Sequence, residues 1–225
     1  MSEFAYVETS ASSRRRAINL RSGDQTLTEV MNVTLAVVAL AFLVPVMLAV
    51  ALAVYLQDGG PILFAHRRIG RNGRIFHCLK FRSMAVQAEE RLAPLLASDP
   101  EARAEWERDH KLKDDPRVTR LGAFLRKTSL DELPQFINVL RGEMSLVGPR
   151  PIVEAEIAKY GRRFRDYCAV KPGITGLWQV SGRNDTSYRT RVALDCVYAR
   201  RRSVGLDARI IAATVPAVLA RRGSY

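Results

Sequence analysis

A long apolar segment, residues 30–56, limits what this 225-residue chain can fold into. The segment has no charged side chain and exceeds the ~20 residues that a helix needs to span the hydrocarbon core of a bilayer. A cleaved signal peptide fits poorly, because the apolar run is too long and begins too far from Met1. The sequence therefore predicts a membrane helix over residues 28–57.

The flanks and the centre of this helix predict how it meets the bilayer. Basic residues lie on both sides of it, at positions 14–16 and 21 before it and 67, 68 and 71 after it. Positive flanks favour the cytoplasmic side, and a straight span cannot place both flanks there. Pro45 removes one backbone hydrogen bond and bends or breaks the helix. A re-entrant helix, broken at Pro45 and leaving on the side where it entered, satisfies both observations; a kinked transmembrane span is the alternative.

The formal net charge of +12 favours an anionic partner: lipid headgroups, a phosphorylated substrate or nucleic acid. Nucleic acid is not expected, because the chain has no zinc-ligand spacing, no basic helix with heptads and no basic–aromatic motif. Residues 1–27 are predicted to be a flexible basic tail that lies against anionic headgroups. The three cysteines have no C-x-x-C spacing, which indicates a reducing, cytoplasmic location for the soluble part.

Residues 58–225 are predicted to form a compact cytoplasmic catalytic domain. With a small β-hairpin and several helices in this domain, the predicted fold class of the whole chain is α+β and mainly helical. Two apolar runs around an Asn72-Gly73 turn predict a β-hairpin over residues 62–81. Periodicity predicts helices at residues 118–127, 133–140, 153–170 and 187–202, and short helices between 85 and 110 that Pro94 and Pro100 interrupt. Lys171-Pro-Gly173 is expected to be a turn. The last segment, 206–219, fits either an interfacial amphipathic helix or a C-terminal core helix.

Asp131 and Glu132 are the candidate catalytic residues. Ser129 followed by Glu132 matches a capping box, so both carboxylates are expected in the first turn of a helix. There the helix dipole would keep them ionised, and free N–H groups would face a phosphate. An ionised Asp131 is able to attack phosphorus as a nucleophile, and Glu132 is able to act as a base or bind a metal. The plainer alternative is that the two acids only complement the helix dipole.

Cations must offset two carboxylates that lie beside a phosphate. The candidates are Lys80, Arg82, Arg126 and Arg150. The last of these lies in a stiff turn, Gly148-Pro-Arg-Pro151, which lowers the entropy lost when the arginine grips an anion. A divalent ion with oxygen ligands, Mg2+ above all, would serve the same purpose, with Asp131 and Glu132 as its ligands.

From about Thr28 onward the chain resembles the monotopic phosphoglycosyl transferases, the bacterial sugar transferases that initiate exopolysaccharide and related glycan assembly. Any one motif would be weak evidence, but several long motifs occur in the order typical of that family. They are the proline-broken membrane helix, Gly60-Pro-Ile-Leu-Phe64, Arg68-Ile-Gly70, Lys80-Phe-Arg-Ser-Met84, the run from Arg126 to Gln135, Gly142-Glu-Met-Ser-Leu-Val-Gly-Pro-Arg-Pro151 and Lys171-Pro-Gly-Ile-Thr-Gly-Leu-Trp-Gln-Val-Ser-Gly-Arg183.

The resemblance implies transfer of a sugar 1-phosphate from a UDP-sugar to polyprenol (undecaprenyl) phosphate, with release of UMP. It implies that Asp131 is the nucleophile that carries the phosphosugar, and that Glu132 binds Mg2+ or deprotonates the lipid phosphate. The implied phosphate-binding residues are Lys80, Arg82, Arg126, Arg150 and Arg183. The implied location is the bacterial inner membrane, with a re-entrant helix and the catalytic domain on the cytoplasmic face. Many members have Ser before the breaking proline where this chain has Val44, so the sharpness of the bend is not implied.

Two other functions are compatible with the residues: a non-catalytic basic membrane adaptor, and a membrane-bound phosphohydrolase that uses Asp131. The adaptor predicts that Asp131→Asn changes no function, and the phosphohydrolase predicts phosphate release without a lipid product. No motif specifies which sugar is transferred or which polymer is made. Both a monomer and a homodimer fit the sequence.

Overall fold

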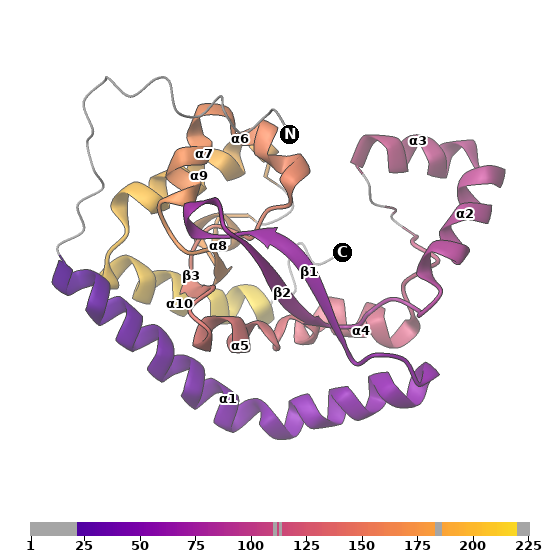
Figure 1. Ribbon diagram of the computed structural model, residues 1–225, viewed down its shortest axis with the longest axis horizontal. Helices are drawn as coiled ribbons and strands as arrows, with labels where there is room; N and C mark the ends of the chain where they lie inside the picture. The colour runs from indigo at the N-terminus through magenta and orange to yellow at the C-terminus, as the bar shows by residue number, and fades with distance from the viewer. Residues whose placement is uncertain (1–21, 110–111, 113, 183–185, 220–225) are drawn as a thin grey trace.

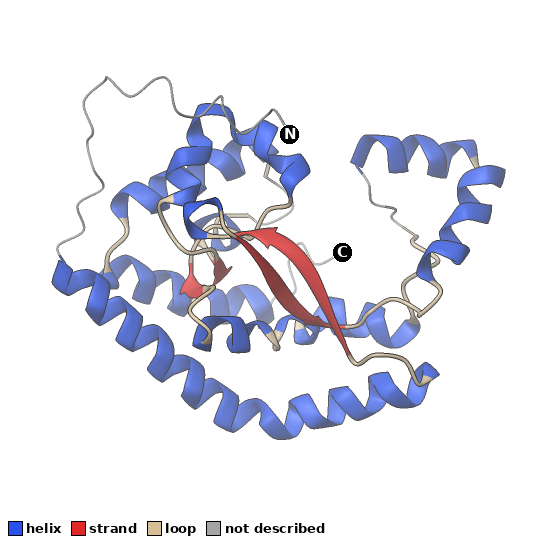
Figure 2. Cartoon of the chain, in the orientation of Figure 1, coloured by secondary structure: helices blue, strands red, loops and turns tan. Residues whose placement is uncertain are grey.

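A β-hairpin crosses the middle of the molecule, and helices lie around it (Figure 2). The computed structural model describes residues 22–109, 112, 114–182 and 186–219. The helices are α1 (Ser22–Asp58), α2 (Ala88–Ser98), α3 (Pro100–Asp109), α4 (Arg120–Thr128), α5 (Gln135–Leu140), α6 (Ile157–Tyr160), α7 (Phe164–Cys168), α8 (Leu177–Val180), α9 (Tyr188–Arg201) and α10 (Val204–Leu219). The strands are β1 (Leu63–Ile69), β2 (Ile75–Phe81), β3 (Ser145–Val147) and β4 (Gly173–Thr175).

The predicted hairpin is confirmed. β1 and β2 pair antiparallel, from Leu63 opposite Phe81 to Ile69 opposite Ile75. The connection uses Asn72 and Gly73 with φ of 59° and 73°, the left-handed values that an Asn-Gly turn supplies readily. Side chains that are directly opposite share one face of the ribbon, so the register decides which residues of the two strands meet.

A second, parallel pair of short strands was not predicted. β3 pairs with β4, and the segment expected to be a turn at residues 171–173 therefore leads into a strand. The segments around Gly148 and Lys171 pass so closely that a Cβ on Gly148 would lie 2.4 Å from the Lys171 carbonyl oxygen. Gly148 donates its N–H to the Thr175 carbonyl, and this contact holds the turn around Arg150 against β4.

Two helix predictions need correction. Residues 153–170 are not one helix but a series of short segments, the 3-10 turns η4 (Glu154–Glu156) and η5 (Gly161–Arg163) alternating with α6 and α7. Gly161 has φ of 50°, which ends α6, since residues other than glycine rarely adopt this conformation. Pro94 lies inside α2 and does not interrupt it, whereas Pro100 begins α3 as expected.

Helix α1 lies along one side of the molecule and changes direction once along its length (Figure 1). It begins at Ser22, inside the predicted tail, and continues through Pro45 to Asp58, so the backbone bends but the helix is not interrupted. Thr28, Asn32 and Ala36 form a buried stripe in its first half. Most other apolar side chains of α1 are exposed, Phe42 by 80%. Of the described helices, α1 alone is long and apolar enough to cross a membrane.

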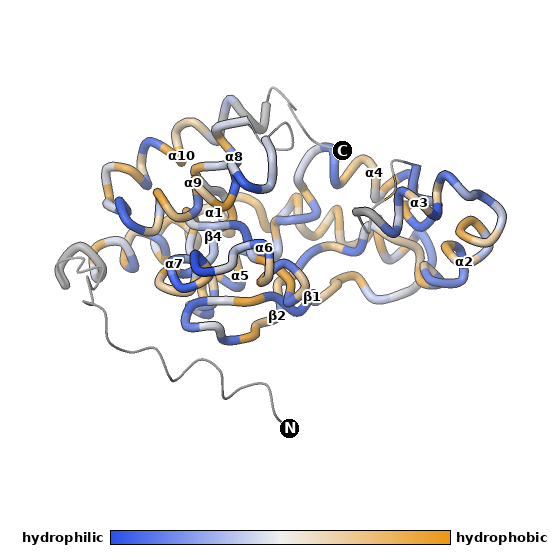
Figure 3. Tube along the Cα trace, turned by 90° about the horizontal axis from the view of Figure 1, so that it is seen from above, coloured by the Kyte–Doolittle hydropathy of each residue, from blue (hydrophilic) through white to orange (hydrophobic). Residues whose placement is uncertain are grey.

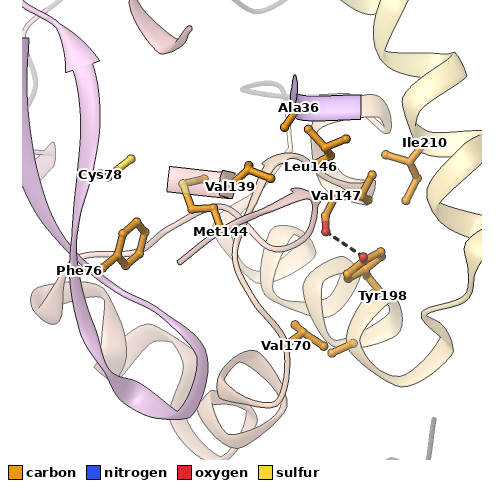
Figure 4. Close-up of a cluster of buried hydrophobic side chains, with 11 residues drawn as sticks. Ala36, Phe76, Cys78, Val139, Met144, Leu146, Val147, Val170, Tyr198 and Ile210 are labelled. Atoms are coloured by element: carbon orange, nitrogen blue, oxygen red, sulfur yellow. Dashed lines mark hydrogen bonds between the residues drawn. The ribbon is translucent and has the colours of Figure 1, made fainter. Parts of the chain in front are cut away.

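Both halves of α1 pack on the same domain. Ala36 joins the largest cluster of buried side chains, in which the Tyr198 hydroxyl bonds the Val147 carbonyl (Figure 4). Val50 and Val54, near the other end of the helix, pack against Phe81 and Leu125.

The remaining helices cover the domain unevenly. α2 and α3 project at one end of the molecule, far from α7, with hydrophilic and hydrophobic stretches alternating along them (Figure 3). α10 packs against α8, the two short strands and α1, and buries Asp207 and Ile210. One face of α10 is thus buried while Ala212, Ala213 and Pro216 are exposed, which fits both alternatives for residues 206–219.

Candidate active site

The carboxylate pair lies in a tight turn between two helices. Asp131 and Glu132 belong to the 3-10 turn η3 (Leu130–Glu132), which connects α4 to α5. Ser129 has φ of 58° and closes the end of α4, donating its N–H to the Arg126 carbonyl. Its side chain caps nothing in the following turn, so the predicted capping box is wrong. The reason is that Ser129 must end one helix in a left-handed conformation, and a helix N-cap needs an extended one.

The side chain of Lys80, on β2 of the hairpin, contacts this turn. Its Nζ lies 2.6 Å from Glu132 Oε1 and 3.5 Å from Asp131 Oδ2, so one ammonium pairs with both carboxylates. These residues are 52 positions apart in the chain, and no local signal predicts their contact. The structure therefore unites three of the predicted site residues.

Asp131 is buried, with 6% of its surface exposed, and this raises the pKa of its carboxyl above the ordinary value. The charge on Lys80 opposes that rise, the charge on Glu132 adds to it, and the charge on Arg126 lowers the pKa again. The sequence predicted an ionised Asp131, and burial works against that ionisation. The effect of desolvation on the pKa is larger than that of the nearby cations, because an ionised carboxylate loses its hydration on burial and the charges around it replace that hydration only in part.

Arg126 and Arg150 approach the site from two sides. Arg126, in the last turn of α4, donates from Nε to Ser83 Oγ at 2.9 Å and is close enough to Asp131 to influence its pKa. Arg150 lines the pocket beside the carboxylates, and its guanidinium lies 6.0 Å from the centre of the Trp178 ring. Among the described residues Arg150 has no carboxylate within 4.0 Å.

One other predicted residue is not brought into this pocket, and a second is not described. Arg82 turns toward the C-terminal end of α1, where its guanidinium pairs with Asp58 and lies 3.4 Å from the Val54 carbonyl oxygen. Gly60 leaves room for this side chain. Arg183 lies outside the described residues, and so does the stretch 1–21 of the predicted tail.

The pocket contains residues that the sequence did not single out. Its walls come from the hairpin, from η3 and α5, from the turn that carries Arg150, and from β4 and α8. Its lining residues are Arg68, Cys78, Lys80, Glu132, Gln135, Arg150, Pro151, Gly173, Ile174 and Gln179. Arg68 was missed as a site residue, although it alternates with His66 on one face of a predicted strand. Gln135 and Gln179 lie within the quoted motifs but carried no separate signal.

Asp131 and Glu132 are also the residues that would have to bind Mg2+. No group of three or more His, Cys, Asp or Glu side chains among the described residues is placed to hold a metal. Two adjacent carboxylates nevertheless match the usual Mg2+ mode, in which one or two protein carboxylates act together with substrate phosphates. Asp131 and Glu132 have that chemistry and already bind one cation, the Lys80 ammonium.

Comparisons with known proteins place the chain in a family. The sequence profile described as Bacterial sugar transferase matches residues 23–221. A UDP-galactose-lipid carrier transferase of Erwinia amylovora is 57% identical over 75% of this chain and 35% of its own length. An undecaprenyl-phosphate galactose phosphotransferase of Salmonella typhimurium is 56% identical over 75% of this chain and 36% of its own. The exopolysaccharide production protein ExoY of Sinorhizobium fredii is 51% identical over 86% of each chain.

The chain thus spans about a third of the first two relatives and most of ExoY. The matched region includes α1 and the parts that line the pocket, among them the hairpin, the carboxylate turn and the turn that carries Arg150. The chain belongs to the bacterial sugar transferase family.

Proposed function

We propose that the protein transfers a sugar 1-phosphate from a UDP-sugar to polyprenol phosphate and releases UMP, as the initiating step of exopolysaccharide or related glycan assembly. The names of the Erwinia and Salmonella relatives include a UDP-sugar, a lipid carrier and undecaprenyl phosphate, which supports this substrate class. The name of the Sinorhizobium relative supports the link to exopolysaccharide.

The observation that carries the proposal is a buried carboxylate, that of Asp131, beside cations and next to Glu132, which lines one end of a pocket. Asp131 Oδ2 lies 3.5 Å from Lys80 Nζ, and Arg126 adds a second positive charge nearby. In the proposed first step, an Asp131 oxygen attacks the phosphorus that bears the sugar. The bond from that phosphorus to the bridging oxygen breaks, and the electron pair leaves with UMP. The phosphosugar is then held on Asp131.

In the second step, an oxygen of polyprenol phosphate attacks the same phosphorus and the Asp131 carboxylate leaves with the electron pair. Glu132 is placed to accept the proton if the lipid phosphate arrives as a monoanion, since its carboxylate is adjacent to the nucleophile. Lys80 orients both acids by pairing with them. Asp131 and Glu132 would hold Mg2+ together with the substrate phosphates, and the ion would neutralise charge on the phosphoryl oxygens.

We also propose that α1 is re-entrant in the inner membrane and that the catalytic domain lies on the cytoplasmic face. Asn32, in the first half of the helix, hydrogen-bonds Ser145 and Leu146 of β3. Asp58, at the last residue, pairs with Arg82 after β2. Two ends that bind one folded domain are supporting evidence that both lie on the same side of the bilayer. The exposed apolar surface between them supports burial in lipid.

A panel of UDP-sugars, assayed for UMP release with and without polyprenol phosphate, tests the proposed reaction. We expect one or a few sugars to give UMP in a lipid-dependent manner, with loss of activity on chelation and recovery with Mg2+. When lipid is withheld, the mass of the intact protein should rise by one phosphosugar, and Asp131→Asn should abolish both signals.

The other outcomes point elsewhere. Release of inorganic phosphate without a lipid product would identify a phosphohydrolase. No UMP from any UDP-sugar, with a folded and lipid-bound protein, would reject the transfer reaction and favour an adaptor. An adduct that maps to a residue other than Asp131 would retain the reaction and reject the nucleophile.

A further inference from the structure

The pocket has two ends of different charge, both reached from one face of the hairpin. Lys80 lies opposite Phe64 and Arg68 lies opposite Phe76, so these four residues share that face. Lys80 and Arg68 are therefore separated by four residues along the ribbon, about 13 Å between Cα positions at a rise of ~3.3 Å per residue. Both side chains line the pocket, which extends between them.

The Lys80 end is neutralised and the Arg68 end is not. Lys80 pairs with two carboxylates, as described above. At the other end, Arg68 and Arg150 are close enough for the charge on Arg150 to lower the pKa of the Arg68 guanidinium, although burial lowers it more. Among the described residues, the one carboxylate within 4.0 Å of Arg68 is Glu156, at 3.8 Å, and it also faces Arg191 at 3.7 Å. Two guanidinium groups, those of Arg68 and Arg191, thus share one carboxylate, and Arg150 adds a third positive charge nearby.

The Arg68 side chain is held in place by neutral acceptors. Nη1 donates to the Pro151 carbonyl at 3.1 Å, and Nη2 lies 3.1 Å from His66 Nδ1. Because a guanidinium only donates, His66 Nδ1 must accept, and the imidazole is neutral with its proton on Nε2. The backbone adds a further tie, since Ile69 donates its N–H to the Ile152 carbonyl at 2.9 Å. Arg68 is therefore a fixed cation beside the turn that carries Arg150.

We propose that Arg68 and Arg150 form a phosphate position used twice in each reaction cycle, first by the phosphate of the departing UMP and then by that of the incoming polyprenol phosphate. This inference rests on the proposed function. The phosphorus attacked by Asp131 lies at the carboxylate end of the pocket, so the other phosphate of the diphosphate must lie toward the other end. That end has the uncompensated positive charge which a phosphate monoester dianion needs.

The chemistry requires that one position serve both phosphates. In an in-line displacement the entering and leaving oxygens lie on opposite sides of the phosphorus. Asp131 enters from one side, so the bridging oxygen departs with UMP from the other, taking the electron pair of the broken bond. When the lipid phosphate later displaces Asp131, its oxygen must enter from the side opposite Asp131. That is the side where UMP left.

The test compares Arg68→Gln with Arg67→Gln, which removes the same charge from the neighbouring, exposed residue on the other face of the strand. Three quantities are measured in the transfer reaction: the inhibition constant of UMP, the inhibition constant of uridine, and the KM for polyprenol phosphate. Loss of a charge-assisted contact to phosphate should raise the inhibition constant of UMP and the KM for the lipid by about tenfold or more. Inhibition by uridine, which has no phosphate, should change less than twofold, and Arg67→Gln should resemble the wild type in all three.

Several results would overturn the inference. An inhibition constant for UMP within twofold of the wild type would remove Arg68 from the phosphate position. An equal rise for UMP and uridine would show that the substitution only distorts the pocket. A rise for UMP without a rise in the KM for lipid would reject the shared position. If Arg68→Gln does not fold, Arg68→Lys, which keeps the charge but not the fork of donors, decides by the same comparison. A wild-type protein that releases no UMP fails the proposed function and not this inference.

Discussion

Asp131 illustrates how a single residue is subject to opposing electrostatic effects. Burial raises the pKa of its carboxyl, while Lys80 and Arg126 lower it. A nucleophilic carboxylate must be ionised, so the cations maintain the reactive form that burial disfavours. A group whose folded-state pKa is raised contributes stability that is fully present below its unfolded pKa and is lost as the pH rises through the folded pKa. At neutral pH, ionised Asp131 therefore lowers the stability of the fold.

We predict that Asp131→Asn abolishes transfer and raises the thermal midpoint. The amide has the same shape without the buried charge, and Lys80 keeps Glu132 at 2.6 Å. The rise should be about 2–4 °C at pH 7.5, the shift that ~1 kcal/mol produces in a chain of this size, and should vanish toward pH 4. Thermal unfolding in detergent at several pH values checks this. A midpoint that falls at neutral pH would mean that the ion pair with Lys80 outweighs desolvation.

Tyr198 and Asp207 raise a different question of protonation. The Tyr198 hydroxyl lies 2.9 Å from the Val147 carbonyl oxygen and 2.8 Å from Asp207 Oδ1, yet it has one hydrogen to donate. Both contacts are hydrogen bonds only if Asp207 is protonated and donates to the tyrosine oxygen. Burial raises the pKa of Asp207, which agrees, while the hydroxyl of Tyr198 and the charge on Arg202 oppose that rise.

We predict that Asp207→Asn is tolerated and Asp207→Leu is not. The amide can donate as the protonated acid does, whereas leucine leaves the buried hydroxyl without that partner, at a cost of about 1–3 kcal/mol. Because the folded-state pKa of Asp207 is raised, the wild type should lose stability as the pH rises through it, and the Asn variant should not. Midpoints measured from pH 5 to 9 check this. If Asp207→Asn were as damaging as Asp207→Leu at every pH, the carboxylate would be ionised and paired with Arg202.

At the scale of elements, α1 is attached to the domain by a polar contact within an apolar helix. Asn32 is buried, and it donates to Ser145 Oγ at 2.9 Å and accepts from the Leu146 N–H at 3.1 Å. β3 is too short to hold its own position, so this side chain fixes the strand against the helix. The turn that carries Arg150 begins directly after β3. The orientation of α1 is thereby linked to the pocket.

We predict that Asn32→Ala destabilises the protein, because two buried polar groups of β3 lose their partner at a cost of about 1–3 kcal/mol. Transfer activity should fall with it, since β3 leads into the Arg150 turn. Thr34→Ala, on the exposed side of the same helix, is the matched control and should change neither property. Equal midpoints for both variants in the same detergent would show that the Asn32 contact contributes nothing.

At the scale of the whole molecule, both halves of α1 contact one body although its length is enough to cross a bilayer. The bend lets a helix of this length contact one domain along both of its arms. Pro45 weakens the hydrogen bonding of the helix and allows the bend, and contacts at each end hold the arms to the domain. The helix is apolar on its exposed side and carries its buried polar side chains, Thr28 and Asn32, where it touches the domain.

We predict that Ser12 and Gln57 lie on the same side of the membrane as the catalytic domain. Single cysteines at Ser12, Gln57 and, as a domain marker, Glu101, in a Cys168→Ser background, should resist an impermeant maleimide in intact cells. All three should react after permeabilisation. Labelling of Ser12→Cys alone in intact cells would require a transmembrane helix. Cys78 and Cys196 are buried and should contribute little background.

Features that depend on residues close together in the sequence were predicted correctly more often than features that depend on contacts between distant segments. The hairpin was predicted because Asn72 and Gly73 supply turn conformations locally. The capping box was wrong because Ser129 served a different helix from the one expected. The β3–β4 pair, held by backbone contacts between segments almost thirty residues apart, has no local signal. Arg82 was expected at the phosphates and instead binds the end of α1.

By itself, the sequence determined the long apolar helix, the hairpin, the carboxylate pair and the family, since each depends on residues that are neighbours in the chain. Only the tertiary structure decided that Lys80 pairs with both acids, that Arg68 joins Arg150 at the far end of the pocket, and that both halves of α1 rest on one domain. Those contacts join residues far apart in the chain. Packing and charge select them only when the whole chain has folded, so no short motif encodes them.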